Sequence, residues 1–182
     1  CRNILTLAGM DDLTSLTAPI YFTHIRFGAY FREMLTTLAN DYEIHPLLFY
    51  SLIRQESMFN PFISSSAGAS GLSQIMPATG AENVSLLNWP DNYDSRDLLL
   101  GQVNLTLGAF YLDRMRTYLS GNTQAALAAY NAGPGNAESW LAISNGDPDL
   151  FLEVLRARET QDYLMQITEF LNIYKLVYSR PQ

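Results

Sequence analysis

Residues 46–61 read PLLFYSLIRQESMFNP. Pro46 suits the first turn of a helix, where its missing N–H would have no intrahelical partner. The apolar side chains that follow recur at three- and four-residue intervals, which predicts an amphipathic helix that ends near the Asn60-Pro61 pair. Glu56 lies four residues after Leu52 and three after Ile53, so its side chain falls on the apolar stripe of this helix. The helix therefore predicts a packed core and places one carboxyl group on its apolar stripe.

Two interpretations of Glu56 follow from this position. A carboxyl group that faces the core without a cationic partner has its pKa raised by desolvation. Such a group stays protonated near neutral pH and can donate a proton to a leaving oxygen. Alternatively, Glu56 turns to solvent in the last turn of the helix, or pairs with Arg54 or Arg32. Taken alone, the helix favours the second interpretation.

Most of the remaining sequence also has helical spacing. Apolar periodicity predicts helices over residues 20–39, 97–119 and 123–130, and a last helix from Tyr163 to Tyr178. Residues 61–73 are rich in Ser, Gly and Ala and are expected to form a loop, residues 85–97 to be irregular, and residues 1–18 to be a frayed tail or part of an upstream segment. No run of strands is evident. The expected fold class is mainly α, with at most a small sheet or hairpin.

Composition excludes several classes of protein. The chain has 182 residues, 48% of them hydrophobic, which excludes a disordered chain. Its 11 basic and 18 acidic residues give a net charge of −7, which argues against a nucleic-acid partner because phosphate contacts need clustered Lys and Arg. No apolar run is long enough to cross a bilayer. Cys1 is the single cysteine, so no internal disulfide can form; it is either the lipidated first residue of a mature lipoprotein or simply the start of the chain.

The sequence offers little support for a metal site. His24 and His45 are too few and too isolated for zinc. Asp91, Asp94 and Asp97 lie close together, which suggests either a metal site or a second catalytic carboxylate. They lack the alternation and the central Gly of a calcium-binding EF-hand loop, so a solvated loop is the favoured interpretation. We therefore expect neither a metal nor a cofactor.

Two segments have the composition of a ligand-binding surface. The Ser/Gly/Ala loop and residues 71–79 combine small residues, which let backbone approach a ligand closely, with neutral hydrogen-bonding side chains. Residues 128–135 place Tyr130 and Asn131 at the end of a helix with a small-residue face. The alternatives are an ordinary tight loop for the first segment, and a half-buried tyrosine with a helix C-cap for the second.

Four motifs in this order resemble the catalytic domain of soluble lytic transglycosylases, enzymes that cut bacterial peptidoglycan and share the lysozyme-like fold of goose-type lysozyme. The motifs are Glu56-Ser57, Gly71-Leu72-Ser73-Gln74-Ile75-Met76-Pro77-Ala78-Thr79, Ala129-Tyr130-Asn131-Ala132-Gly133-Pro134-Gly135 and Glu159-Thr160-x-x-Tyr163. The resemblance covers about residues 44–178. It implies a lysozyme-like catalytic domain over residues 41–182, with residues 1–40 as an N-terminal extension whose aromatic helix packs on that domain.

The resemblance also implies roles for individual residues. Glu56 is the expected sole catalytic acid/base. Four residues match motif positions that line the substrate groove: Ser66, Gln74, Tyr130 and Asn131. Glu159 matches a polar residue beside the site; the alternative is an ion pair with Arg156 or Arg158. Ser73 stands where the family usually has Met, which puts sugar packing at that subsite in doubt but not the acid.

The implied reaction needs a single carboxyl group. Typical glycosidases use two, but the 2-acetamido group of peptidoglycan can take the place of the second. Cleavage between N-acetylmuramic acid and N-acetylglucosamine would then leave a 1,6-anhydromuramic end. Two alternatives stay open: a hydrolytic lysozyme on the same fold, and a catalytically silent peptidoglycan-binding domain. The resemblance further implies an exported bacterial protein of the periplasm or cell envelope, monomeric, and at a membrane only if lipidated at Cys1 or linked upstream.

Overall fold

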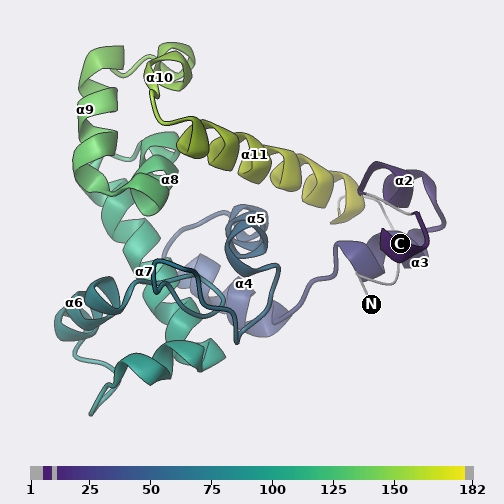
Figure 1. Ribbon diagram of the computed structural model, residues 1–182, viewed down its shortest axis with the longest axis horizontal. Coiled ribbons are helices and arrows are strands. Elements are labelled where there is room, and N and C mark those ends of the chain that lie inside the picture. The colour runs from purple at the N-terminus through teal and green to yellow at the C-terminus, as the bar shows by residue number, and fades with distance from the viewer. Residues whose placement is uncertain (1–5, 10–11, 179–182) are drawn as a thin grey trace.

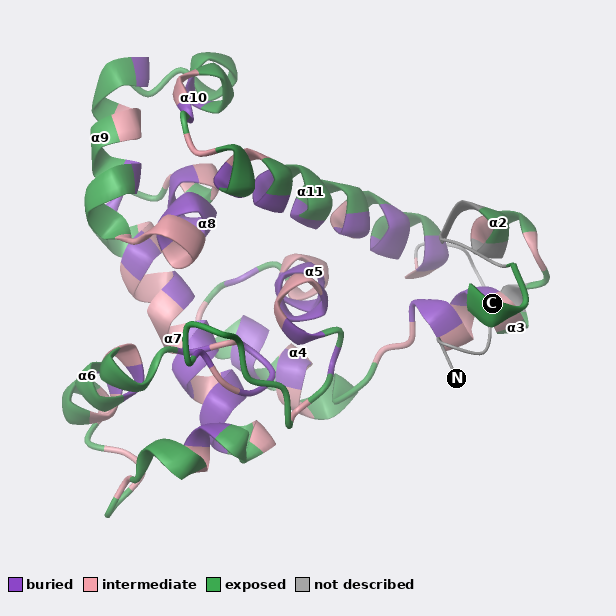
Figure 2. Cartoon of the chain, viewed as in Figure 1, coloured by how far each residue is buried: buried purple, intermediate pink, exposed green. Residues whose placement is uncertain are grey.

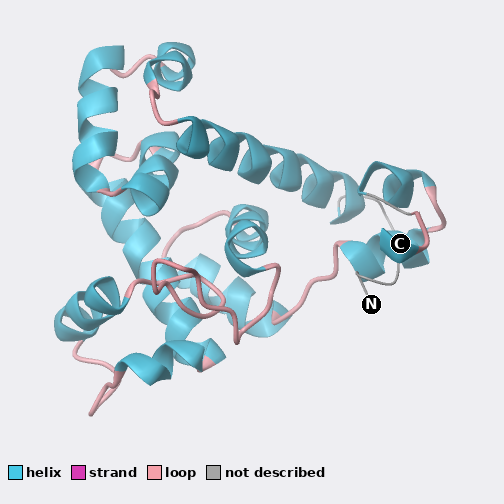
Figure 3. Cartoon of the chain, in the orientation of Figure 1, coloured by secondary structure: helices cyan, strands magenta, loops and turns pink. Residues whose placement is uncertain are grey.

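The computed structural model describes residues 6–9 and 12–178 (Figure 1), so the interpretation of Cys1 lies outside the described residues. Helices follow one another along nearly the whole described chain (Figure 3). From α2 onward their bounds are α2 Asp12–Thr17, α3 Ile20–Arg26, α4 Arg32–Asp41, α5 Pro46–Ser57, α6 Pro77–Leu87, the 3₁₀ helix η1 Ser95–Leu99, α7 Gly101–Tyr118, α8 Thr123–Ala132, α9 Pro134–Ser144, α10 Pro148–Val154 and α11 Arg158–Tyr178.

Helix α5 lies at the centre of the core. It packs between α11 on one side and α4 on the other, and α7 and α8 complete the surrounding layer (Figure 1). Leu52 and Ile53 are fully buried, as the periodicity of this segment predicts, and purple buried positions line the inner face of α11 as well (Figure 2). Their burial anchors α5, and hence the carboxyl group near its end.

The predicted single helix over residues 20–39 is wrong. The chain forms α3 and α4 instead, with a break at residues 27–31 where Phe31 adopts a left-handed conformation with φ of 54°. Tertiary contacts stabilise the break. The Arg54 guanidinium donates to the Arg26 carbonyl (2.8 Å) and the Tyr178 hydroxyl donates to the Phe27 carbonyl (2.7 Å), so two carbonyls at the end of α3 find partners from α5 and α11. A periodicity count cannot detect such donors.

The structure differs from the sequence prediction in three further segments. Helix α6 extends through Leu87 and η1 occupies part of the segment expected to be irregular. Residues 131–135 do end α8, but Pro134 immediately begins α9, a helix that the sequence analysis missed. Helix α2 forms within the segment expected to be a frayed tail.

The mainly α fold class is confirmed. Among the described residues the only β-type pairings are isolated bridges, Ser64 with Ser70 and Ser70 with Ile75, within the loop between α5 and α6. The same part of the chain contains no helix that combines the length and the apolar character needed to span a bilayer.

Candidate active site

Glu56 lies in the last turn of α5, just before Met58 ends the helix in a left-handed conformation. Its side chain turns toward α11, where the Tyr163 hydroxyl donates a hydrogen bond to Glu56 Oε1. Burial raises the pKa of Glu56 to about 7, and the hydrogen bond from Tyr163 opposes this rise only in part. The carboxyl group is therefore largely protonated at slightly acidic pH and keeps a substantial protonated fraction at neutral pH.

The arginines that the sequence offered as partners of Glu56 serve other contacts. The Arg54 guanidinium lies over the rings of Phe27 and Phe170, at 4.2 and 4.8 Å from their centroids. Arg32 lines a separate small cavity beside Tyr50. Burial of Glu56 is thus the physical cause of its raised pKa, and the side chain neither pairs with these arginines nor turns fully to solvent.

Glu56 opens into a cavity of about 320 Å³ between the end of α5, the end of α8 and the start of α11. Six residues line this cavity: Gln55, Glu56, Asn131, Glu159, Asp162 and Tyr163. The structure thus brings together three of the residues singled out by sequence. Gln55 and Asp162 were missed, although Asp162 follows Glu159 at a three-residue spacing that puts both on one face of α11.

Asn131 and Glu159 are held differently at the cavity. The Asn131 Oδ1 accepts a hydrogen bond from the buried Thr160 hydroxyl (2.8 Å), which fixes the orientation of the amide. Glu159 is exposed, and in the described part of the chain no ion pair joins it to Arg156 or Arg158. The ion-pair alternative for Glu159 is therefore wrong, and its carboxylate faces the cavity without a cationic partner.

Tyr130 lies behind the cavity, at the junction of α8, α7 and the loop before α6. Its hydroxyl donates to the Ser73 carbonyl (2.9 Å). Burial raises its pKa well above the usual value, and the negative charge of Glu56 raises it further, so the two side chains are electrostatic neighbours. Tyr130 is thus half-buried, as the alternative to a ligand-binding role predicted, and it is also an electrostatic neighbour of Glu56.

Ser66 and Gln74 lie outside the cavity that contains Glu56. Ser66 is exposed in the loop between α5 and α6. Gln74 adopts φ of 46°, and its Nε2 donates to the carbonyls of Gly71 (2.8 Å) and Ile63 (3.2 Å), so its amide holds the loop together. The structure therefore places these two residues on the loop beside the cavity rather than in it.

Two of the three aspartates considered as a metal site, Asp94 and Asp97, form a helix cap, and Asp91 is exposed in the turn before it. Asp94 accepts from the Arg96 backbone N–H (3.0 Å) and Asp97 accepts from the Asp94 N–H (2.9 Å), a reciprocal pair that begins η1. Arg96 also forms an exposed ion pair with Asp94. No cluster of three potential metal ligands occurs among the described residues. His45 caps α5 through Nδ1, which accepts from the Leu47 N–H (3.2 Å).

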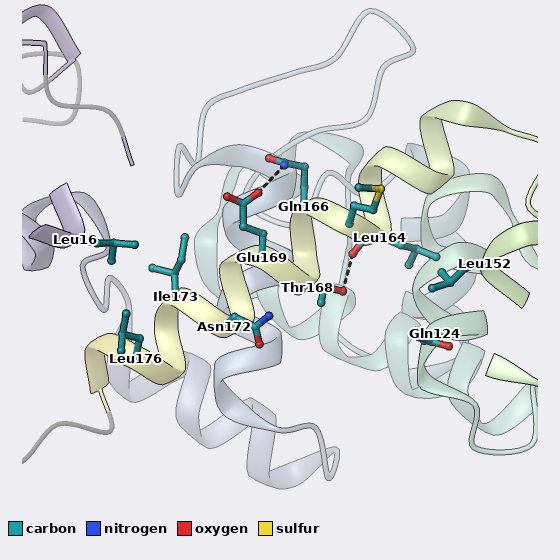
Figure 4. A pocket seen from close by; sticks show the side chains of 11 residues that line it. Leu16, Gln124, Leu152, Leu164, Gln166, Thr168, Glu169, Asn172, Ile173 and Leu176 are labelled. Atoms are coloured by element: carbon teal, nitrogen blue, oxygen red, sulfur yellow. Dashed lines mark hydrogen bonds between the residues drawn. The ribbon is translucent and has the colours of Figure 1, made fainter. Parts of the chain in front are cut away.

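A larger groove of about 680 Å³ runs along another part of α11, between Leu16, Leu152 and Leu176 (Figure 4). Thr168 and Asn172 are among its polar residues, and Gln166 donates to Glu169 at its rim. None of the residues that line it belongs to the four motifs. Of the expected site residues, Glu56, Asn131 and Glu159 thus lie together in the smaller cavity.

The family model described as "Transglycosylase SLT domain" matches residues 33–149. The chain belongs to this family. Residues 33–149 include Glu56, the loop before α6 and the Tyr130-Asn131 pair, and they exclude the start of α11 with Glu159 and Tyr163.

Curated relatives include the soluble lytic murein transglycosylases of Salmonella typhimurium and Escherichia coli K12, at 34% and 32% identity over 152 residues. In both cases the alignment covers 82% of this chain and 24% of the relative, so the chain spans about a quarter of their length. More distant relatives include a membrane-bound lytic murein transglycosylase C of Glaesserella parasuis, at 26% identity.

Solved structures of this family share the fold. The 70 kDa soluble lytic transglycosylase of Escherichia coli aligns with a TM-score of 0.80 at 29% identity, covering 96% of this chain and 29% of that one. Its complex with bulgecin A gives 0.82 at 28% identity, covering 98% and 30%. An inactive Glu-to-Gln mutant of Slt from Pseudomonas aeruginosa gives 0.78 at 28% identity, covering 100% and 30%. The lysozyme-like fold expected from the motifs is therefore confirmed.

Proposed function

We propose that this chain is a lytic transglycosylase that cleaves peptidoglycan between N-acetylmuramic acid and N-acetylglucosamine and leaves 1,6-anhydromuramic ends. One observation carries the proposal: Glu56 is a desolvated carboxyl group, held by Tyr163, that opens into a polar cavity. Family membership and the relatives named as murein transglycosylases support the same substrate.

Glu56 performs both proton transfers in this proposal. Tyr163 donates to Oε1, so the acidic proton rests on Oε2 and is delivered to the glycosidic oxygen as the bond breaks. The substrate's 2-acetamido group stabilises the oxocarbenium-like carbon. Glu56, now a carboxylate, takes the proton of the muramic C6 hydroxyl, which attacks C1. The hydrogen bond from Tyr163 stabilises the charged form between the two transfers, and no water is consumed.

The other site residues bind substrate in this proposal. Asn131 and Glu159 contact the glycan from the cavity wall, and Tyr130 from behind it. Ser66 and Gln74 contact the glycan along the loop beside the cavity, whereas the Ser73 side chain is fully buried against α7. We further propose an N-terminal extension over residues 1–40 and a catalytic domain over residues 41–182. We also propose that the protein is exported to the periplasm or cell envelope as a monomer, and that it is held at a membrane only if it is lipidated at Cys1 or linked upstream.

The chemical nature of the new muramic end tests the proposal. Purified peptidoglycan is digested with the chain, and the released fragments are identified by mass spectrometry. Anhydro ends should dominate in the wild-type digest and be absent with Glu56→Gln. Peptidoglycan that pellets with the protein but releases no fragments would instead indicate the silent binding domain.

A hydrolytic lysozyme activity is the second candidate, because the cavity contains two carboxylates besides Glu56. A hydrolase needs a base that positions a water molecule, and Glu159 and Asp162 both line the cavity. Reducing muramic ends, one water heavier than anhydro ends, would indicate hydrolysis. In that case Glu159→Gln or Asp162→Asn should abolish activity, whereas the transglycosylase proposal predicts that each retains anhydro products.

A further inference from the structure

Asn104, on α7, uses its side-chain amide to join the loop that carries the second motif to η1. Its Oδ1 accepts from the Ser73 backbone N–H (2.6 Å), and its Nδ2 donates to the carbonyls of Ser70 and Leu98 (2.8 Å each). The side chain is fully buried. The acceptor and one donor are therefore committed to loop backbone that sequence analysis connected with the substrate groove, and the other donor is committed to η1.

The same loop sits tightly against α7. A Cβ at Gly71, whose φ is +79°, would collide with Asn104 and the Leu98 carbonyl. A Cβ at Gly108 would collide with the Ser73 side chain and lie 3.2 Å from the Tyr130 hydroxyl. Both glycines therefore allow the loop to lie where Asn104 can reach it.

The contact leads from Asn104 to the acid. Asn104 holds the Ser73 peptide, and the Ser73 carbonyl is the acceptor of the Tyr130 hydroxyl proton (2.9 Å). A phenol has one proton to donate, so Tyr130 turns its oxygen lone pairs, rather than its proton, toward its remaining neighbours. Glu56 is an electrostatic neighbour of this hydroxyl, since its negative charge raises the pKa of Tyr130.

We propose that Asn104 is a positioning residue of the active site: by fixing the Ser73 carbonyl, it keeps the Tyr130 proton away from Glu56 and so keeps Glu56 in its acidic form. The inference rests on the proposed function of Glu56. A Tyr130 hydroxyl released from Ser73 would donate to the Glu56 carboxylate and stabilise the charged form. The acid would then be ionised at a lower pH.

Several other titratable groups surround Glu56 and must be held constant in a test. They are Tyr163, Glu159 and Asp162 of α11, which line its cavity, and Tyr130 of α8, whose pKa the Glu56 charge raises. Tyr111 of α7 in turn interacts with both tyrosines. The pKa shift of Glu56 arises from burial and Tyr163, with no contribution from a charge on α4, which packs against the other side of α5. A neutral substitution at position 104 leaves all of these charges unchanged.

The test is the pH profile of kcat/KM on soluble peptidoglycan fragments for wild type, Asn104→Ser, Tyr130→Phe and the double variant. Serine is neutral and too short to hold all three backbone groups. Asn104→Ser should move the alkaline limb of the profile downward by about one pH unit. In the Tyr130→Phe background, which lacks the hydroxyl, the same substitution should not move the limb.

Asn83→Ser is the matched control. Asn83 is equally buried and also contacts α7, through the Leu107 carbonyl (3.4 Å), but it does not touch the loop. It should lower the melting temperature without moving the limb. The inference is overturned if Asn104→Ser lowers activity without moving the alkaline limb. It is also overturned if Asn104→Ser moves the limb equally in the Tyr130→Phe background.

Gly108→Ala provides a second route if Asn104→Ser does not fold. It leaves Asn104 intact but pushes Ser73 away from α7. The limb should again move downward, and an unmoved limb in a folded, active Gly108→Ala enzyme overturns the inference. A wild type that releases no anhydro products would refute the proposed function itself, whereas a normal wild type with an unresponsive limb refutes only the role of Asn104.

Discussion

Glu56 and Asp94 carry the same chemical group, yet their surroundings shift their pKa values in opposite directions. Glu56 is half-buried with a desolvated carboxyl group, receives one hydrogen bond from a neutral hydroxyl, and has its pKa raised to about 7. Asp94 is exposed and has its pKa lowered by the side chain and backbone N–H of Arg96. The difference shows that a carboxyl group has its pKa raised through loss of water without gain of a cation.

The largest expected effect is on the rate of fragment release and comes from removing the desolvated carboxyl group of Glu56. Glu56→Gln keeps the size and the Tyr163 contact but has no acidic proton, so the rate of fragment release should fall by about 10²–10⁴-fold. The rate is measured on purified peptidoglycan, with circular dichroism to verify the fold. Asp94→Asn is the control and should retain wild-type activity; an active Glu56→Gln enzyme would remove Glu56 from its role.

The second effect is on stability as a function of pH. The pKa of Glu56 rises from 4.5 to about 7 on folding, so between these values the folded chain keeps a proton that the unfolded chain has lost. The free energy of unfolding should therefore fall as pH rises through this window. The total loss, relative to Glu56→Gln, is about 3 kcal/mol. Urea unfolding of both proteins from pH 4 to pH 8 measures this difference, and parallel stability curves would contradict a raised pKa.

A third effect is expected from removing the hydrogen bond to Glu56. Tyr163→Phe takes away the interaction that lowers the pKa of Glu56, so the alkaline limb of the activity profile should move upward. The stability cost is about 1 kcal/mol. Tyr118→Phe is the matched control, because the Tyr118 hydroxyl also donates to a carboxylate, Glu138 (2.8 Å), but at an exposed site. The alkaline limb of the Tyr118→Phe activity profile should not move.

The smallest effect concerns the exposed carboxylate. Asp94→Asn removes the ion pair with Arg96 but keeps an oxygen that can cap η1. Exposed ion pairs contribute little to stability. The melting temperature should change less than in Tyr163→Phe, as differential scanning calorimetry can determine. A larger loss at Asp94 than at Tyr163 would contradict the contrast between the two environments.

Local sequence patterns predicted the parts of the molecule that depend on local spacing. Leu52 and Ile53 are buried as their periodicity indicated, and the α5 helix carries Glu56 toward the core. The break between α3 and α4 was missed because donors from Arg54 and Tyr178, distant in sequence, stabilise it. Tertiary contacts thus override a regular local pattern.

The site was predictable to a similar degree. The motifs identified Glu56, Asn131 and Glu159, which do share one cavity. They did not show that Ser66 and Gln74 lie outside it, because loop conformation depends on backbone contacts such as those of Gly71. The role of Asn104 was also invisible, since a buried amide in a helix has no distinctive spacing and its partners lie more than thirty residues away for Ser73 and Ser70.

The most direct measurement is the titration of Glu56 itself. Carboxyl ¹³C signals of labelled protein are followed from pH 3 to pH 9 by NMR, and comparison with Glu56→Gln assigns the resonance. A midpoint near pH 7 is the predicted result for a carboxyl group kept neutral by burial. A midpoint near the ordinary value for glutamate would contradict the proposal that Glu56 is poised to donate a proton.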